Sequence, residues 1–301
     1  MYLLKSSVIL VTGGTGFIGS NFIKKMALIG GNVHLIVREE SKKDQIDIDI
    51  LNKINIHKLG KEQDSLIQIM ESIKPDIVFH FASLFISEHQ PEDITMLIDS
   101  NILFGVKLLE AMKLCGATKL VNTGTSWQNF NNSEYSPTNL YAATKQAYED
   151  IIKYYVESGS LQAVTLKLFD TYGVNDERQK LINILKYIAE TGECLSMSPG
   201  EQLIDLVHVD DVVEAFIIAG SRLLNSEDIR ISEYSISSGR PISLKDLVKL
   251  ISKVSNKKLN IEWGGRPYRD REVMTPWSTG ETLPGWSPKL SLEQGICQYY
   301  E

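Results

Sequence analysis

The chain has 301 residues, 43% of them hydrophobic, and carries 38 acidic against 31 basic residues, for a net charge of −7. This length and composition suit one large α/β domain or two modest ones with a sizeable core. The two signs of charge are interspersed, which argues against a nucleic-acid or anionic-membrane surface. No apolar stretch reaches the ~20 residues of a membrane helix. No signal cleavage pattern follows the first apolar run, so a cytoplasmic protein is expected.

The three cysteines, Cys115, Cys194 and Cys297, are odd in number and widely separated. They show no CxxC or Cys/His ligand spacing, which argues against a zinc site and predicts no bound metal. We interpret them as structural thiols of a protein in a reducing compartment.

Short β-branched runs alternate with helical patterns from residue 7 to residue 169. Six strands are predicted, at residues 7–12, 33–37, 54–59, 76–82, 119–123 and 163–169. Helices are predicted between them, at residues 17–31, 62–75, 94–115 and 141–157. Strands that are apolar throughout indicate burial on both faces, as in a parallel sheet covered by helices. The pattern predicts a Rossmann-type, doubly wound α/β sheet.

The alternation of strand and helix patterns becomes less regular after residue 169, and the later elements are smaller. We predict helices near residues 179–190, 211–224 and 243–255 and after residue 291, with a strand at 233–237. Residues 1–172 are expected to form a dinucleotide-binding domain, to which elements near 206–238 return. Residues 173–301 are expected to form a smaller, mixed α/β, substrate-binding part. Ligands should then bind between the two parts, at the carboxyl ends of the strands.

A glycine-rich turn follows the first predicted strand directly. The segment TGGTGFIG places Gly13, Gly16 and Gly19 in a GxxGxxG spacing between a strand and a helix. Glycines allow a tight turn and close approach of the backbone to a pyrophosphate, whose charge faces the helix amino terminus. The turn therefore predicts a dinucleotide site.

The end of the second strand bears on which dinucleotide binds. An acidic residue there favours NAD through the ribose hydroxyls, and an arginine favours NADP through the 2′-phosphate. Arg38 is the first polar residue after the strand, 19 positions beyond Gly19, and Lys42 and Lys43 follow closely. We favour NADPH/NADP; in the alternative, Arg38 only caps a turn and Glu39 binds the ribose of NAD.

The segment YAATK places Tyr141 and Lys145 four residues apart at the start of a predicted helix. Such residues are neighbours on a helix face. The spacing alone fits either a surface pair or a proton donor beside the cation that tunes it. The preceding strand ends in NTGTS, which brings the hydroxyls of Thr125 and Ser126 to the same edge of the sheet.

Taken together and in order, these motifs resemble the extended short-chain dehydrogenase/reductase family of sugar-nucleotide epimerases, dehydratases and reductases. The resemblance covers nearly the whole chain. The matching segments are TGGTGFIG, HFAS, Asn101 within a long helix, NTGTS, YAATK, LKLFDTYGVND, GEQLIDLVHVDDVVEAF and RDREVM with LPGWSPKLSLEQGI.

The resemblance implies a role for each matching residue. Tyr141 would be the acid/base, Lys145 would hold the nicotinamide ribose and lower the tyrosine pKa, and Thr125 would hydrogen-bond the reacting oxygen. Asn101 would support the active-site helix and a water; in the alternative, it is a helix-breaking polar residue that merely finds a hydrogen-bond partner. The cofactor-binding residues would be Gly13, Thr15, Gly16, Phe17, Ile18, Gly19, Arg38, Lys42, Ala82, Ser83, Asn101, Tyr141, Lys145 and Phe169. The substrate-binding residues would be Thr125, Ser126, Tyr141, Asp170, Gln202 and Arg269.

A Coulomb estimate agrees with the implied role of Lys145. A free tyrosine titrates near ~10, and a cation ~4 Å away at an effective dielectric of ~20 stabilises the phenolate by roughly 4 kcal/mol. The estimate predicts a Tyr141 pKa near neutrality, where an acid/base works best.

Dehydratases of the family carry an Asp-Glu pair directly after the threonine, and this chain has Ser126 and Trp127 there. The choice is therefore between a reductase, which consumes NADPH, and a 4-epimerase, which keeps NAD bound. Arg38 favours the reductase. The chain looks most like bacterial reductases of nucleotide-linked 4-keto-6-deoxyhexoses, such as the CDP-abequose and CDP-paratose synthases of deoxysugar and surface-glycan (lipopolysaccharide O-antigen) biosynthesis. A regulator that binds the dinucleotide without turnover is disfavoured because both Tyr141 and Lys145 are present.

The substrate contacts depart from the family pattern at two positions. Ile204 stands where an arginine usually binds the diphosphate. Arg269 matches the family's other phosphate-binding arginine, and Arg271 or Arg266 is expected to compensate for the missing one. Asp170 stands where an asparagine is common and is expected to bind a sugar hydroxyl. The resemblance also implies a homodimer, formed as a four-helix bundle by the helix at 94–115 and the Tyr141 helix.

Three other kinds of residue are assigned to the framework. His80 and His208 are interpreted as core histidines; in the alternative, His80 borders the cofactor pocket. Asp210 or Asp211 is expected to cap the helix that follows His208. Trp263, Trp277 and Trp286 are expected to pack within the smaller part.

Overall fold

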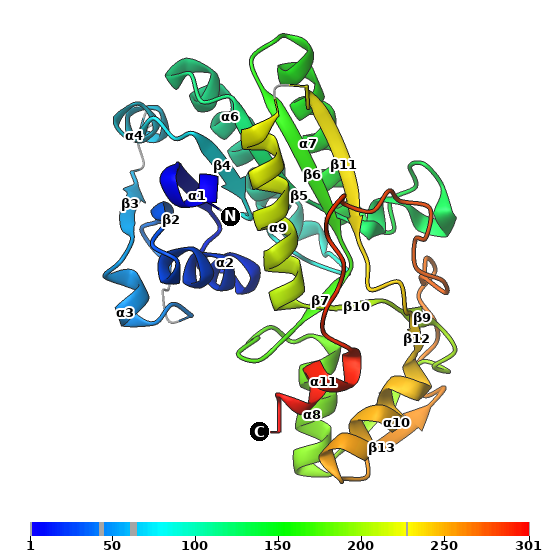
Figure 1. Cartoon of the computed structure of the whole chain (residues 1–301). Coiled ribbons are helices and arrows are strands. Elements are labelled where there is room, and N and C mark those ends of the chain that lie inside the picture. The colour runs from blue at the N-terminus through cyan, green and yellow to red at the C-terminus, as the bar shows by residue number, and fades with distance from the viewer. Residues whose placement is uncertain (1, 42–44, 61–64, 227, 301) are drawn as a thin grey trace.

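A large open sheet covered by helices forms the upper part of Figure 1, with a smaller group of elements below it. The computed structural model describes residues 2–41, 45–60, 65–226 and 228–300. Seven strands in this portion form one parallel sheet in the order β11-β6-β5-β4-β1-β2-β3. They are β1 (Val8–Thr12), β2 (Asn32–Arg38), β3 (Asn55–Leu59), β4 (Ile77–His80), β5 (Lys119–Thr125), β6 (Gln162–Leu168) and β11 (Ile231–Ile236).

The strand order reverses between β1 and β4, as in a doubly wound sheet, and the predicted fold class is confirmed. The six strands predicted between residues 7 and 169 are all present, and β11 adds a seventh beside β6. Ligands bind at such a reversal, outside the carboxyl ends of the strands. Those ends carry the glycine turn after β1, Arg38 on β2 and Thr125 on β5.

Helices cover both faces of the sheet, as Figure 1 shows for α2 and α9 on the near side. One face packs against α1 (Tyr2–Ser6), α2 (Phe17–Leu28), α3 (Ile48–Leu51) and α9 (Val209–Asn225). The opposite face packs against α4 (Ser65–Ile73), α6 (Phe104–Cys115) and α7 (Leu140–Glu157). The sheet residues alternate between the two cores; for example, Ile77 and Phe79 belong to the first and Val78 to the second. None of the described helices has the length and apolar character needed to cross a membrane.

The long helix expected at residues 94–115 is present but interrupted. It consists of α5 (Ile94–Ile98), the π-helix η2 (Asp99–Leu103) and α6. A π-helical turn inserts residues into the helical ladder and is frequent at functional sites. Here it carries the buried Asn101.

The smaller group of elements has a core of its own. It contains α8 (Leu181–Thr191), α10 (Leu244–Ser255) and α11 (Leu292–Cys297). Three short strand pairs, which the sequence did not predict, complete it and join it to the sheet. They are β7 (Asp170–Tyr172) with β10 (Leu206–His208), β8 (Cys194–Met197) with β13 (Asn260–Trp263), and β9 (Leu203–Ile204) with β12 (Ile242–Ser243). Short 3-10 turns lie at η1 (Pro91–Asp93), η3 (Ser126–Gln128) and η4 (Phe130–Asn132).

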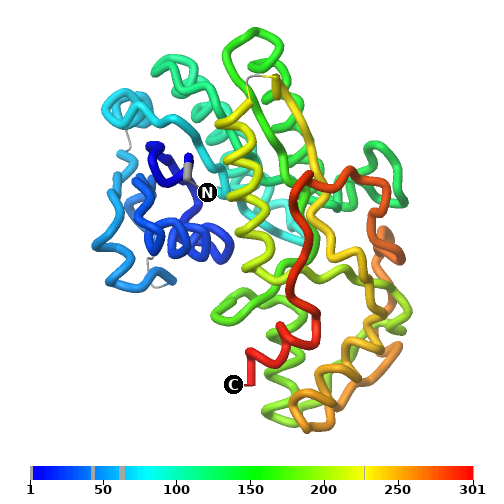
Figure 2. Tube along the Cα trace, in the orientation of Figure 1, coloured from blue at the N-terminus to red at the C-terminus, as the bar shows by residue number. Residues whose placement is uncertain are grey.

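The C-terminal segment connects the two groups, as the red trace in Figure 2 shows. Thr282 bridges to Ser235 on β11. The indole N–H of Trp286 donates to the Asp211 carbonyl on α9. Trp286 and Trp277 belong to the core of the large sheet, so the prediction that they pack within the smaller part is wrong, whereas Trp263 does pack there.

The helix cap predicted near residue 210 is also different. His208 itself is the N-cap of α9, and its Nδ1 accepts a hydrogen bond from the Asp210 backbone N–H. Asp211 instead accepts from the Leu290 backbone N–H, which fixes the C-terminal segment. His208 is buried, in agreement with the framework role expected of it.

Candidate active site

The glycine turn between β1 and α2 is shaped by close backbone contacts. Gly13 has a φ of +71°, and a Cβ there would lie 2.2 Å from the backbone nitrogen of Ala82. A Cβ at Gly19 would lie 2.4 Å from the Gly13 carbonyl oxygen. Both positions therefore require glycine, and the turn passes directly over the loop that follows β4.

The same turn leaves the start of α2 open to an anion. The helix α2 begins at Phe17, and Gly16 is its N-cap. Gly16 has no side chain that could accept hydrogen bonds from the first N–H groups of the helix. Thr15 and Ile18, the other predicted contacts, lie in the turn and first helical turn and are partly exposed. Free N–H groups and the helix dipole suit a pyrophosphate, so the residues present fit a dinucleotide.

Arg38 lies at the carboxyl end of β2, where the adenosine ribose of such a dinucleotide would be read. Its side chain is 72% exposed and forms an ion pair of 3.4 Å with Glu40. Exposed pairs of this kind contribute little, so the guanidinium can exchange Glu40 for another anion. Lys42, the second predicted cation, lies outside the described residues.

Asn101 holds the loop after β4 against the active-site helix. Its amide donates to the Leu84 carbonyl at 2.9 Å and to the Thr144 hydroxyl at 3.0 Å. Its carbonyl accepts from the Leu84 N–H at 2.7 Å and from the Ser83 hydroxyl at 3.2 Å. Thr144 in turn donates to the Tyr141 carbonyl. Every polar group of the buried amide is thus used to align Ser83 and Tyr141.

Tyr141 and Lys145 occupy the first turns of α7, which Asn139 caps by accepting a hydrogen bond from the Ala142 N–H. Both side chains are buried. Thr125, at the end of β5, is also buried, and its Oγ1 accepts from the Trp127 N–H at 3.3 Å. This bond leaves the hydroxyl hydrogen of Thr125 free to donate to a ligand.

The expectation of a Tyr141 pKa near neutrality is wrong for this arrangement. Burial raises the pKa of Tyr141 to about 12, and it outweighs a hydrogen bond with Ser83 and the charge of Arg178, which lower it. Burial also lowers the pKa of Lys145 to about 8. The physical reason is that desolvation disfavours the charged form of both partners.

His80 is a core residue, as predicted. Its Nδ1 hydrogen-bonds the Thr12 hydroxyl at 2.7 Å across β4 and β1. Burial, with a smaller effect from Lys145, lowers the pKa of His80 to about 3, so its ring is neutral. It supports the strand ends from beneath the site.

A pocket of about 1030 Å³ opens beside these residues. Ser126 and Leu140, the neighbours of Thr125 and Tyr141, line it, as do parts of the smaller group such as α8 and α10. The predicted site residues that line it are Ser126, Phe169, Asp170, Gln202 and Arg269. It therefore lies between the catalytic candidates and the smaller part, as predicted from the sequence.

Asp170 lies within this pocket among cations. Burial raises the pKa of its carboxyl group, and Lys180 is the strongest of the cations that oppose the rise, before Arg178 and Arg269. Arg269 itself is paired with Glu88, and both side chains are more than half exposed. Gln202 donates to the Ser198 hydroxyl, while its buried Oε1 has no hydrogen-bond partner among the described residues. The pocket thus offers cations, a carboxylate and a free acceptor to a polar ligand.

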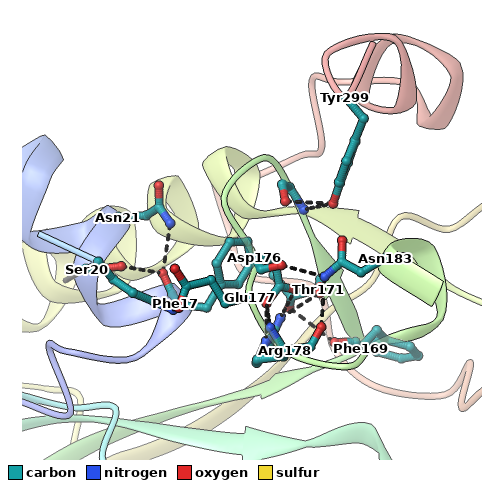
Figure 3. Close-up of polar contacts among 12 residues, drawn as sticks. Phe17, Ser20, Asn21, Phe169, Thr171, Asp176, Glu177, Arg178, Asn183 and Tyr299 are labelled. Carbon is teal, nitrogen blue, oxygen red and sulfur yellow. Dashed lines mark hydrogen bonds and ion pairs between the residues drawn. The ribbon is translucent and has the colours of Figure 1, made fainter. Parts of the chain in front are cut away.

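Figure 3 shows how the loop after β7 contacts the glycine turn. The Arg178 guanidinium lies 4.6 Å from the centre of the Phe17 ring. Two bonds of 2.7 Å hold it to the buried Asp176 carboxylate, and a third runs to the Thr171 carbonyl. Tyr299 fixes the same loop by donating to and accepting from the Gly173 backbone. A cation is thereby held at the start of α2.

Sequence reasoning missed Arg178 and the aromatic neighbour of Tyr141, Phe85, with the Lys180 ammonium that lies over it. The Phe85 ring lines the pocket and packs edge-on against Tyr141 at 5.0 Å between centroids. It also contacts Trp127, and the Lys180 ammonium lies 3.6 Å from its centre. The one available signal was the charged run DERQK after β7, which places Arg178 and Lys180 at the carboxyl edge of the sheet.

Among known proteins, the NAD dependent epimerase/dehydratase family model matches residues 9–232. CDP-abequose synthase of Salmonella typhimurium is 28% identical over 98% of both chains. UDP-glucose 4-epimerase of Cyamopsis tetragonoloba is 25% identical over 98% of this chain and 94% of its own. The structure of Thermus thermophilus UDP-glucose 4-epimerase in complex with NAD superposes with a TM-score of 0.80 over 96% of both chains, at 22% identity, which is evidence for the fold.

The match to the family model spans most of the chain and includes the glycine turn, Thr125, Tyr141 and Lys145. It agrees with the doubly wound fold and with the tight glycine turn at Gly13 and Gly19. The resemblance predicted from the sequence is confirmed: the chain belongs to the NAD dependent epimerase/dehydratase family, the extended short-chain dehydrogenases/reductases, whose members act on sugar nucleotides with a nicotinamide dinucleotide.

Proposed function

We propose that the protein reduces the C4 ketone of a nucleotide-linked 4-keto-6-deoxyhexose with NADPH, in deoxysugar and surface-glycan biosynthesis. The supporting observation is the segment at the end of β5: the buried Thr125 ends the strand, and Ser126 and Trp127 follow it with no carboxylate. Elimination of water needs an acid and a base beside the sugar, and these two residues supply neither. The similarity to CDP-abequose synthases supports the same choice.

The chain's own residues would orient the ketone and deliver a proton. Bound nicotinamide supplies the hydride. Tyr141 retains its proton at neutral pH, because burial raises its pKa to about 12, and it would donate that proton to the alkoxide forming at C4. The Thr125 hydroxyl would donate a hydrogen bond to the same oxygen and stabilise the developing charge. Lys145 would bind the ribose hydroxyls and hold the cofactor beside Tyr141.

Arg38 supports NADPH because its exposed guanidinium lies at the carboxyl end of β2. The second candidate is an NAD-dependent sugar-nucleotide 4-epimerase. It is favoured by Glu39 and Glu40 beside Arg38, and by fold neighbours that were solved with NAD.

The substrate would bind in the pocket between the two parts of the chain. In this proposal residues 1–172, with the elements near 206–238, hold the dinucleotide, and residues 173–301 hold the sugar nucleotide. The diphosphate would bind Arg269 after it releases Glu88. Ser126, Asp170 and Gln202 would hydrogen-bond the sugar or its base. We place the protein in the cytoplasm, since its three cysteines are free thiols.

We also propose a homodimer through a four-helix bundle. Exposed apolar side chains gather on the outer helices α5, η2, α6 and α7. They are Ile94, Met96, Ile98, Leu103, Leu114 and Tyr154, all at least 37% exposed. A second copy would cover them by packing the same helices against one another.

The reductase proposal is tested with purified protein and a panel of CDP- and dTDP-linked 4-keto-6-deoxyglucoses. We expect oxidation of NADPH in preference to NADH with at least one of them. Tyr141→Phe should lose turnover by more than about 100-fold and still bind the cofactor. Tyr154→Phe, which alters an exposed tyrosine on the same helix, is the matched control. Full turnover in Tyr141→Phe would contradict the proposal.

The identity of the copurified cofactor separates the two candidates. An epimerase would release NAD on denaturation and would interconvert sugar nucleotides without consuming it. A reductase should instead show an NADPH preference that falls at least about tenfold in Arg38→Ala, since one contact to the 2′-phosphate is lost. An unchanged preference would remove Arg38 from the cofactor site.

Light scattering tests the dimer. We expect twice the chain mass of 33.8 kDa at micromolar concentration. Leu103→Lys should yield the monomer, because it places a charge in the proposed interface. Leu28→Lys, at a leucine on α2 that is more exposed than Leu103, should not change the mass. A monomeric wild-type protein would refute the dimer.

A further inference from the structure

Charged side chains form a line behind the proposed catalytic pair. Lys145 and Glu149 lie one turn apart on α7, and Tyr141 lies one turn before them. Lys145 is 1% exposed, and the Glu149 side chain is 10% exposed. The Lys167 ammonium on β6 lies 3.9 Å from the Glu149 carboxylate and 3.1 Å from that of Glu233 on β11. Figure 1 shows α7 lying behind β6 and β11, which carry these partners.

The Glu149 carboxylate is placed against the end of β5 that carries Thr125. A Cβ at Gly124 would lie 2.7 Å from its Oε1, so the absence of a side chain there lets the carboxylate approach the strand. This Oε1 is buried and has no hydrogen-bond partner among the described residues. Burying a carboxylate in this way is costly unless its charge interacts with cations. The two cations near it are Lys145 and Lys167.

We propose that Glu149 is a positioning residue, which keeps the buried Lys145 ammonium protonated and in place beside Tyr141 at neutral pH. The inference rests on the proposed roles of Tyr141 and Lys145. A fully buried amine tends to lose its proton, and a carboxylate one helical turn away opposes that loss. Without the carboxylate, Lys145 would be a neutral amine for much of the physiological pH range.

The remaining groups around Lys145 do not substitute for Glu149. Burial lowers the pKa of Lys145 to about 8, and Glu149 is the group that raises it. Burial raises the pKa of Glu149 to about 7, opposed first by Lys167, then by a hydrogen bond with the Gln128 side chain, and also by Lys145. The other titratable groups that face the pair are Tyr141 on α7, His80 on β4, Lys167 on β6 and Glu233 on β11. Tyr141 and His80 are neutral and Lys167 is a cation, so none of them can stabilise the Lys145 ammonium. Glu233 carries a negative charge but forms its ion pair with Lys167.

Lysine NMR measures the protonation of Lys145 directly. The protein is labelled with ¹³C at lysine Cε, the Lys145 signal is assigned with Lys145→Arg, and its shift is followed against pH. We expect a midpoint near pH 8 in the wild type, in line with the lowered pKa. In Glu149→Gln the midpoint should fall by about one to two pH units, the size of an interaction between charges about 6 Å apart at an effective dielectric near 20.

Two variants serve as controls. Glu233→Gln makes the same chemical change at the outer end of the line and should move the Lys145 midpoint by less than about 0.3. Glu149→Asp keeps the negative charge but moves it away by one methylene, so the Lys145 midpoint should shift by an intermediate amount. Glu149→Asp also takes the place of Glu149→Gln if Glu149→Gln does not fold. A Lys145 midpoint unchanged in both Glu149 variants would overturn the inference, even if they were less stable.

Activity gives a second readout, and it separates this inference from the proposed function. The alkaline limb of kcat/KM for NADPH-dependent reduction should move to lower pH in Glu149→Gln by the same amount as the NMR midpoint. If no keto sugar is reduced, the reductase proposal fails while the NMR result still decides the role of Glu149. If the midpoint moves and the alkaline limb does not, the Glu149 charge raises the pKa of Lys145 without any effect on the reaction, and the positioning role is refuted.

Discussion

Replacing Asn101 by alanine should destabilise the protein and disturb the active site together. The buried amide makes four hydrogen bonds, two to the Leu84 backbone and one each to the Ser83 and Thr144 hydroxyls. Each is worth about 0.5–1.5 kcal/mol net, and the half-buried Leu84 groups can regain water in the variant. We therefore expect a loss of about 2–4 kcal/mol in the free energy of unfolding.

Urea denaturation followed by tryptophan fluorescence measures this loss, and the variant Asn225→Ala is the control. Asn225 is exposed and makes one hydrogen bond within its own helix, so its replacement should cost less than about 0.5 kcal/mol. Because Asn101 also holds Ser83 against Tyr141, turnover of the folded variant should fall further than its cofactor affinity. If Asn101→Ala were as stable as the control, the π-helical turn would not owe its position to these bonds.

Three further outcomes follow from the geometry. Gly19→Ala should weaken binding of the dinucleotide at least about tenfold in a fluorescence titration, because its Cβ would lie 2.4 Å from the Gly13 oxygen and open the turn. His80 has a folded pKa of about 3 against 6.5 unfolded, so the unfolded state binds the proton more readily. The stability that the neutral His80 contributes is present above pH 6.5 and is lost on acidification, by up to ~1.4 kcal/mol per pH unit. In urea denaturation, His80→Gln should therefore lose less stability than the wild type between pH 7 and pH 5. Arg178→Gln leaves the buried Asp176 carboxylate unpaired and should lower the free energy of unfolding by about 2 kcal/mol. Adding Asp176→Asn should restore part of that loss. Equal stability of the single and double variants would contradict the pairing.

The parts of the site that the sequence predicted are those set by local geometry. The turn at Gly13 and Gly19 is specified by a strand, a helix and the need for the backbone to pass within contact of itself. Tyr141 and Lys145 lie on one face of α7 because residues four apart are neighbours on a helix. Thr125 follows from the end of a buried strand. In each case a short segment of sequence contains both the feature and its cause.

Contacts between distant segments could not be predicted in the same way. Phe17 and Arg178 are 161 positions apart, and their stacking depends on the path of the loop after β7, which Asp176 and Tyr299 fix. The assignment of Trp286 failed for a similar reason. Its sequence neighbours suggest the smaller part, but its indole follows a hydrogen bond to the Asp211 carbonyl on α9.

The error in the expected pKa of Tyr141 has a more general cause. The Coulomb estimate counted the attraction between a phenolate and an ammonium at short range and left out the cost of burying either charge. In the folded protein that cost dominates at both groups, raising the pKa of Tyr141 to about 12 and lowering that of Lys145 to about 8. A neutral phenol beside a cation is suited to giving up a proton only when negative charge appears next to it. The burial that contradicts the estimate therefore favours Tyr141 as a proton donor to a new alcohol, which is the direction of chemistry that a ketone reduction requires.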